Sequence, residues 1–251
     1  MSFRVRWPFL RWNTSTLLLV CLAVSCDAPD ARGVRRTTPE NARGDSVIRG
    51  RVIFTGTPPV MQPIENRPCH SGAKPIRQET VLVDSTGGLK NVFVYLQGGP
   101  AVDGSSLPPA VLDQIDCRYE PHVVGVTVKQ PLIVKSSDPT LHNTHYTPAN
   151  NPSENFALRT AGHQKTVRFI APEIFPVRCD VHPWMTAYIG VFDNPFFSIT
   201  TDSGEFLINN VPEGDYTLTA WHEIYGELRQ KVTVKRGQAI DINFEYKPPG
   251  T

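Results

Sequence analysis

The residues whose chemistry stands out lie close together near position 180. A cysteine, a histidine and a methionine follow one another at three-residue intervals in the run Cys179-Asp180-Val181-His182-Pro183-Trp184-Met185. Upstream lies a second histidine, His142, followed by Asn143. One thiolate, two imidazoles and a weak thioether form the donor set of a type 1 copper site. We therefore predict that Cys179, His142, His182 and Met185 hold one copper ion, with Met185 as the axial ligand.

Each of these residues also has an ordinary structural interpretation. Cys179 and Met185 could be core filler, and His142 could be a surface or capping residue. Zinc could bind the same cysteine and two histidines, but methionine is a poor zinc ligand. A dinuclear copper centre would need a second cysteine in the loop, and the loop has none. The combination of residues favours a single copper ion.

Short β-forming runs, separated by turn residues, must position these ligands. The chain contains 23 Pro and 18 Gly, so few stretches could hold a helix, and residues 109–114 are the one candidate. In residues 216–221, Tyr216, Leu218 and Ala220 fall on one face of a strand. Many short strands at regular spacing predict an all-β sandwich or barrel.

The His142-Asn143 pair and the loop from Cys179 to Met185 resemble the cupredoxin family, in its short-loop, amicyanin-like and plastocyanin-like form. The resemblance covers about residues 115–193. It implies a Greek-key β-sandwich with one blue copper ion. It also implies that the backbone around Asn143 hydrogen-bonds the Cys179 sulfur and ties the two ligand loops together. Val181 departs from the proline that amicyanins often have there, which leaves the ligand set intact.

Two residues of the loop flank His182 and could contribute to binding. Pro183 and Trp184 either form an apolar docking patch for a redox partner or merely cover the site. His145 is expected to lie beside the site without being a ligand.

The C-terminal part resembles the carboxypeptidase regulatory-like family, a transthyretin-like β-sandwich. The resemblance rests on the turns 202–204 and 212–215, and no peptidase motif accompanies it. Only about 50 residues match, too few for a whole sandwich. Residues 47–54 and 91–96 resemble that family's first strands. We therefore expect an all-β protein, with a cupredoxin-like Greek-key sandwich inserted into a smaller transthyretin-like sandwich.

The other cysteines of the body, Cys69 and Cys117, have two interpretations. We predict a disulfide that staples the first segment to the copper domain, because exported proteins fold in an oxidising compartment. The alternative is a second metal site in which Cys69 and His70 combine with Cys117 and His122.

The N-terminus has the features of an export signal. Basic residues precede an apolar run at 17–24 that is too short to span a membrane comfortably. Small residues then precede Cys26, as in bacterial lipoprotein signals, so we predict lipidation of Cys26; ordinary cleavage nearby is the alternative. The expected organisation is a signal peptide (1–26), a disordered linker (27–45), an N-terminal β segment (46–100), a cupredoxin domain (101–194) and a carboxypeptidase regulatory-like sandwich (195–251).

A net charge of +1 and the lack of a basic run exclude a nucleic-acid partner. The sequence therefore predicts a periplasmic or cell-surface one-electron carrier, without turnover of its own, that exchanges electrons mainly through His182. Its partner would be a redox protein such as a c-type cytochrome or a dehydrogenase. The rival functions are a copper-handling protein, an oxidase or reductase, and a cell-envelope binding or structural module. An aromatic groove away from His182 would favour the last of these.

Overall fold

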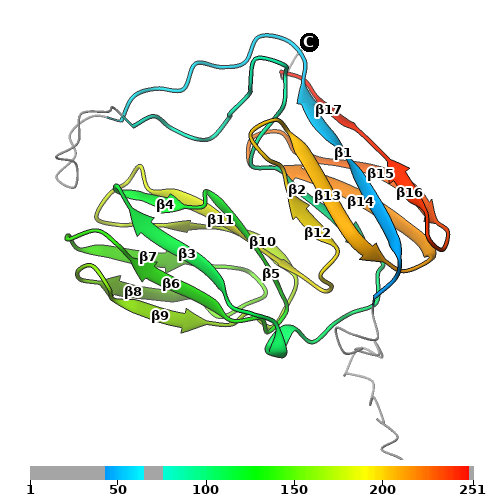
Figure 1. The fold of residues 1–251 in the computed structure, drawn as a ribbon. Helices are drawn as coiled ribbons and strands as arrows, with labels where there is room; N and C mark the ends of the chain where they lie inside the picture. Colours follow the sequence, from blue (N-terminus) through cyan, green and yellow to red (C-terminus); the bar gives the residue numbers. More distant parts are fainter. Residues whose placement is uncertain (1–42, 65–75, 249–251) are drawn as a thin grey trace, which may run out of the picture.

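The β-forming runs become seventeen strands and one short 3-10 helix, η1 (Gly104–Ser106), within residues 43–64 and 76–248, which the computed structural model describes. The strands form four sheets, arranged as two β-sandwiches that lie side by side (Figure 1). The all-β expectation is therefore confirmed. Across the described residues, no helix has the length and apolar character needed to cross a membrane.

The first sandwich contains all four predicted copper ligands. One of its sheets has the strand order β4 (Arg118–Glu120), β3 (Ala110–Ile115), β6 (Leu132–Ser136), β9 (Gln164–Val167). The other has the order β5 (Val123–Thr127), β11 (Thr186–Phe192), β10 (Glu173–Arg178), β7 (His142–Tyr146), β8 (Glu154–Leu158). Side chains from both sheets form one buried apolar cluster between them.

The second sandwich combines strands from the two ends of the described chain. One sheet has the order β13 (Glu205–Val211), β1 (Ser46–Phe54), β16 (Ala239–Asp241), with β17 (Phe244–Tyr246) also paired to β1. The other has the order β12 (Phe197–Ile199), β2 (Phe93–Gln97), β14 (Gly214–His222), β15 (Gly226–Val234). Strands β1 and β2 pair with strands from the C-terminal part of the chain. The first sandwich, called the copper-ligand sandwich below, lies between these two parts in the sequence, so the second sandwich is split.

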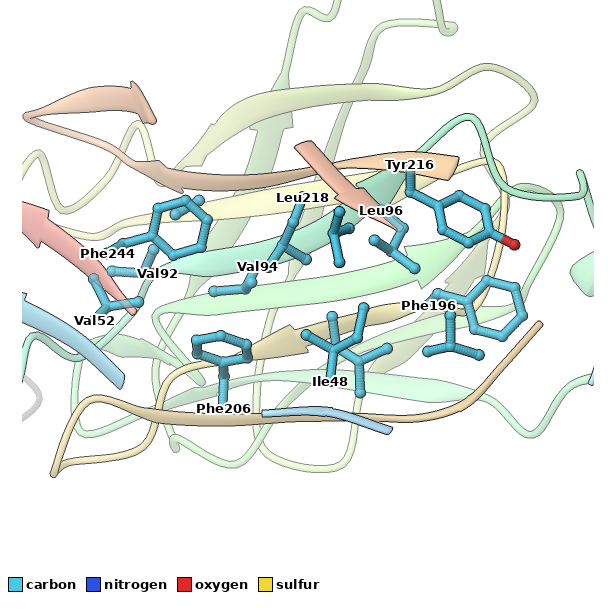
Figure 2. Packing of buried hydrophobic residues seen from close by; sticks show 14 of the residues in the cluster. Ile48, Val52, Val92, Val94, Leu96, Phe196, Phe206, Tyr216, Leu218 and Phe244 are labelled. Atoms are coloured by element: carbon cyan, nitrogen blue, oxygen red, sulfur yellow. The ribbon is translucent and has the colours of Figure 1, made fainter. Parts of the chain in front are cut away.

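Figure 2 shows the core of the split sandwich, where residues from both chain segments interdigitate. Ile48 and Val52 of β1 meet Phe206 of β13 and Phe244 of β17. Tyr216, Leu218 and Ala220 share one face of β14 and are all buried, as expected, and Thr219 on the other face is buried too.

A third apolar cluster joins the two sandwiches. It is centred on Phe93 of β2, Val123 of β5 and Phe192 of β11, all of them buried. Gly125 makes the close packing possible, because a Cβ atom there would lie 2.4 Å from the ring of Phe197. The ring nitrogen Nε2 of His122, in the first sandwich, pairs with a carboxylate oxygen of Glu223 in the second, and both side chains are buried. Apolar packing and this polar contact therefore fix the junction.

The helix considered for residues 109–114 is wrong, because this segment forms strand β3. Its burial follows a period of two, with Leu112 and Gln114 facing inward. Parallel pairing with β6 and antiparallel pairing with β4 satisfy its backbone. Tertiary pairing therefore overrides the local pattern.

Candidate metal centre

Two elements of the first sandwich bring the predicted ligands together. His142 is the first residue of β7, and residues 179–185 connect β10 to β11. Strands β7 and β10 are hydrogen-bonded neighbours. Backbone hydrogen bonds from Cys179 N to Met185 O (3.1 Å) and from Met185 N to His182 O (2.9 Å) close the connection into a tight loop. The loop thus lies against the start of β7.

Three donor atoms converge in this buried position. His142 Nδ1 lies 2.9 Å from His182 Nδ1, and Cys179 Sγ lies 4.0 Å from the first nitrogen and 3.7 Å from the second. The exposed fractions of His142, Cys179 and His182 are 0%, 2% and 3%. Transition-metal bonds of about 2.0 Å to imidazole nitrogen and about 2.3 Å to sulfur span a triangle of similar size. The residues present therefore fit a metal ion, and the donor types are consistent with copper.

The carboxylate of Asp138 fixes the orientation of the His142 ring. Asp138 Oδ2 lies 2.8 Å from His142 Nε2, and the carboxylate also accepts hydrogen bonds from the backbone N–H groups of Asp116 (2.8 Å) and Cys117 (2.9 Å). A proton on Nε2, held by the carboxylate, leaves the Nδ1 lone pair directed at the cluster. Sequence reasoning missed Asp138, whose one signal is its place four residues before His142.

The His182 ring is prepared for metal binding by its surroundings. Burial, together with the neighbouring His142, lowers the pKa of His182, and Asp138 acts in the opposite direction. A lowered pKa keeps the ring neutral at pH 7, which is the protonation state that binds a metal ion.

Met185 is buried, with 1% of its surface exposed, in the same apolar cluster as Cys179. Its role as the axial ligand stays a prediction.

The side chain of Asn143 links the two ligand elements. Asn143 Oδ1 accepts a hydrogen bond from Asp180 N (2.6 Å), and Asn143 Nδ2 donates to Asp180 Oδ2 (2.8 Å) and to Asn155 Oδ1 (2.8 Å). His145 lies 3.0 Å from the other carboxylate oxygen of Asp180. The predicted hydrogen bond from the backbone near Asn143 to the Cys179 sulfur stays a prediction.

Tyr119 and Gln114 support the same region from the facing sheet, and sequence reasoning missed both. Tyr119 donates to the carbonyl of Asn143 (2.8 Å), and Gln114 Nε2 donates to the same carbonyl (3.1 Å). Both side chains are almost fully buried. No local sequence signal marks them, because they reach the site from the distant strands β3 and β4.

Cys117 is disulfide-bonded, and Cys179 is the free cysteine among the described residues. The predicted partner Cys69 and the lipidation candidate Cys26 lie outside those residues. The disulfide at Cys117 and the pairing of His122 with Glu223 do not fit the alternative second metal site, whose other residues, Cys69 and His70, lie outside the described residues. The Cys117 Sγ also lies within 4.8 Å of nitrogens of His142 and His182. Because a disulfide offers no thiolate, we assign the thiolate role to Cys179.

Pro183 and Trp184, which flank His182, lie on the side of the loop that faces the segment between β1 and β2. The Trp184 ring centroid lies 5.3 Å from that of His182, and Trp184 Nε1 donates to the Cys117 carbonyl (3.1 Å). Pro183, Trp184 and Met185 line a cavity of about 190 Å³ whose opposite wall includes Ile64 and Glu79. The described part of that segment extends toward the first sandwich (Figure 1).

A larger groove, of about 600 Å³, lies at the junction of the two sandwiches, and none of the copper-ligand candidates lines it. Its wall combines aromatic rings with polar groups, including Tyr95, Phe192, Trp221, Glu173, Glu227 and Gln97. Tyr95 donates a hydrogen bond to Glu227 (3.2 Å). Burial, with a further contribution from Glu227, raises the pKa of Tyr95 to about 12, so its hydroxyl stays protonated.

Comparison with known proteins gives matches to parts of the chain. A family model described as "Polysaccharide lyase family 4, domain II" matches residues 184–242. No similar curated protein is found. The transthyretin-like resemblance stays a prediction.

Three solved structures illustrate the structural matches. A purple cupredoxin from Nitrosopumilus maritimus is 18% identical, and the match covers 33% of this chain and 98% of that chain with a TM-score of 0.29. An oxidised amicyanin mutant is 16% identical, and the match covers 34% of this chain and 84% of that chain with a TM-score of 0.31. A copper-containing nitrite reductase from Thermus scotoductus SA-01 is 17% identical, and the match covers 56% of this chain and 28% of that chain with a TM-score of 0.30. Cupredoxins are therefore among the solved structures that this chain is similar to.

Proposed function

We propose that this protein is an exported type 1 copper protein that acts as a one-electron carrier. The observation that carries the proposal is the convergence of Cys179 Sγ with the Nδ1 atoms of His142 and His182, at 2.9 to 4.0 Å from one another, in a buried position. With Met185 as the weak fourth ligand, these donors make up the type 1 set. Copper bound there supplies a reversible one-electron couple.

The surrounding hydrogen bonds suit a carrier better than an enzyme. Asp138 holds His142, and Asn143 holds the loop that contains Cys179, so the donors keep one arrangement in both oxidation states. Four protein ligands leave no open coordination position of the kind that catalytic metal sites keep for substrate. We therefore propose no turnover at this centre.

The surface beside the ligands supports docking of a partner. Val181, next to His182, has 47% of its surface exposed, and Leu141, next to His142, has 43%. Such apolar side chains suit a transient contact with another redox protein, for which a c-type cytochrome or a dehydrogenase are the candidates. The disulfide at Cys117 supports export, and a lipid on Cys26 would tether the protein to a membrane.

The proposal is tested by the visible absorption spectrum of the purified protein after Cu(II) is added. We expect an intense band near roughly 600 nm that bleaches reversibly with reductant and vanishes in Cys179→Ser. His145→Gln, beside the site, should keep the band. A colourless protein would refute the carrier, and a bound but redox-silent, exchangeable copper ion would point to copper handling.

The groove at the junction favours a second candidate function, the binding of a neutral oligosaccharide. Aromatic rings such as Tyr95 and Trp221 can pack against sugar rings, and Gln97 and Glu227 can bond hydroxyl groups. The name of the matched lyase domain points the same way. Because its charged lining residues are Glu173, Asp193 and Glu227, the groove would disfavour acidic sugars.

Isothermal titration calorimetry with a panel of neutral oligosaccharides tests this candidate. Binding should be lost in Trp221→Ala and kept in Leu207→Ala, whose side chain is exposed elsewhere on the same sandwich. If none of the oligosaccharides produces a binding isotherm with the native protein, the groove is not a saccharide site.

A further inference from the structure

Cys117 occupies an unusual backbone position. Asp116 and Cys117 form the two-residue connection between β3 and β4, with φ angles of 55° and 52°. In two-residue hairpin turns with both φ angles positive, Gly is strongly preferred at the second position. A cysteine held there by its surroundings is the kind of backbone outlier that points to a function.

The surroundings that hold Cys117 are the supports of the proposed copper site. Its N–H donates to Asp138 (2.9 Å), the carboxylate that also holds His142, and its carbonyl accepts from Trp184 (3.1 Å), beside His182. The Cys117 Sγ lies within 4.8 Å of a nitrogen of each of these two histidines. The turn therefore delivers a second sulfur to the ligand cluster.

The oxidation state of this sulfur decides whether it can act as a ligand. In the disulfide it has no thiolate to offer. A dithiol reductant would cleave the bond with two electrons and two protons, giving the Cys117 thiol, the thiol of its partner and the oxidised dithiol. Binding of Cys117 to a metal ion would then release the thiol proton.

We propose that the Cys117 disulfide is a redox switch of the metal centre: when it is reduced, Cys117 becomes a second thiolate ligand beside Cys179, His142 and His182. This inference rests on the proposed function, because it concerns the same site. The oxidised protein has the one-thiolate set of blue copper. The reduced protein has a two-thiolate, two-imidazole set, which favours Zn²⁺ and Cu(I) over Cu(II).

The test uses Co²⁺, a spectroscopic substitute for zinc, with full-length protein carrying Cys21→Ser and Cys26→Ser, so that the remaining thiols are those of the body. Two further variants both remove the predicted disulfide. Cys69→Ser leaves a thiol at position 117, whereas Cys117→Ser leaves the thiol at position 69. We expect the thiolate-to-Co²⁺ charge-transfer absorbance of Cys69→Ser to be about twice that of Cys117→Ser, because the ion gains a second thiolate.

The parent protein provides a second measurement that needs no disulfide-removing variant. Treatment with a water-soluble phosphine, which reduces disulfides, should raise its Co²⁺ charge-transfer absorbance about twofold, to the level of Cys69→Ser. Equal one-thiolate spectra in Cys69→Ser, in Cys117→Ser and in the phosphine-treated parent would overturn the switch. The blue Cu(II) band of the oxidised parent is recorded separately, so failure of the carrier function and failure of the switch can be told apart.

Discussion

Asp138 is the side chain that most directly fixes the ring orientation of the proposed ligand His142. It is buried and lies 2.8 Å from His142 Nε2. Replacing it by Asn keeps the volume but removes the charge and the strong acceptor. We expect Asp138→Asn to lower copper affinity by about 10- to 100-fold, measured by competition with a chelator.

A matched control for that change is Asp241→Asn. Asp241 also accepts from a basic group, Arg49, but on the exposed face of the other sandwich. It should leave copper affinity unchanged. Equal affinities in both variants and in the native protein would show that the Asp138 carboxylate does not support the site.

His222 should make stability depend on pH. Burial, with a smaller contribution from His122, lowers the pKa of His222 from 6.5 to about 4. Between those values the unfolded chain binds the proton and the folded chain does not. The free energy of unfolding should therefore be highest above about pH 6.5 and fall by up to about 3 kcal/mol as the pH drops to 4.

Urea unfolding at pH 7.5 and pH 4.5 measures this effect. His222→Asn should flatten the dependence while keeping an acceptor for the Ile224 N–H, which now bonds His222 Nδ1 (3.1 Å). His163→Gln, at an exposed histidine, should retain it. A native-like pH dependence in His222→Asn would contradict the assignment.

At the residue level, side-chain type and spacing were enough to single out the ligand candidates. Cys179 and His182 lie in one loop, so three-residue spacing reveals them, whereas the Asn after His142 marks that residue only through the resemblance to cupredoxins. The sequence could not place Asp138 or Cys117 at the centre. Their positions depend on two turns and on the pairing of β3 with β4, which the local pattern does not encode.

At the level of elements, the aromatic cluster between β2, β5 and β11 should dominate the stability of the junction. Phe93 is fully buried there and contacts the rings of Phe192 and Trp221, with centroids 5.5 and 5.7 Å away. We expect Phe93→Ala to lower the free energy of unfolding by about 3–5 kcal/mol, measured by chemical denaturation.

Leu207→Ala is the comparison for this change, because Leu207 lies on strand β13 with 51% of its surface exposed. It should cost less than about 1 kcal/mol. A Phe93→Ala protein as stable as the Leu207→Ala protein would show that the junction cluster contributes little.

Strands with regular alternation were the elements best predicted from sequence. Apolar Tyr216, Leu218 and Ala220 alternate with threonines in the sequence, and they lie within β14. Residues 109–114 were assigned incorrectly because their apolar residues are too few to distinguish a period of two from a period of 3.6. The parallel pairing with β6 determines that this segment is a strand, and β6 begins only at Leu132, well beyond the segment in the sequence.

At the level of the whole molecule, the buried pair His122–Glu223 connects the two sandwiches. Glu223→Ala leaves His122 without its partner in a buried position, which typically costs about 1–3 kcal/mol. Replacing both residues by apolar ones, as in His122→Phe with Glu223→Leu, should recover most of that loss. Thermal unfolding of the two variants compares them, and a double variant less stable than Glu223→Ala would contradict this view.

The domain arrangement was predictable only in part. Turn signals after the copper motif, and runs before it that resemble the first strands of the same family, suggested a split sandwich, because the C-terminal part alone was too short. The contacts that fix the junction, such as Phe197 against Gly125, could not be foreseen. They depend on the relative placement of two sandwiches, which no local pattern records.

The split of the second sandwich also sets the order in which the two sandwiches can fold during synthesis. Strand β1 leaves the ribosome early, yet its partners β13, β16 and β17 lie more than 150 residues downstream. The copper-ligand sandwich is continuous in the chain and can fold as soon as β11 emerges. Until the C-terminus appears, the edges of β1 and β2 remain open to foreign strands. A premature stop near the end would therefore leave a folded metal centre joined to an aggregation-prone remnant.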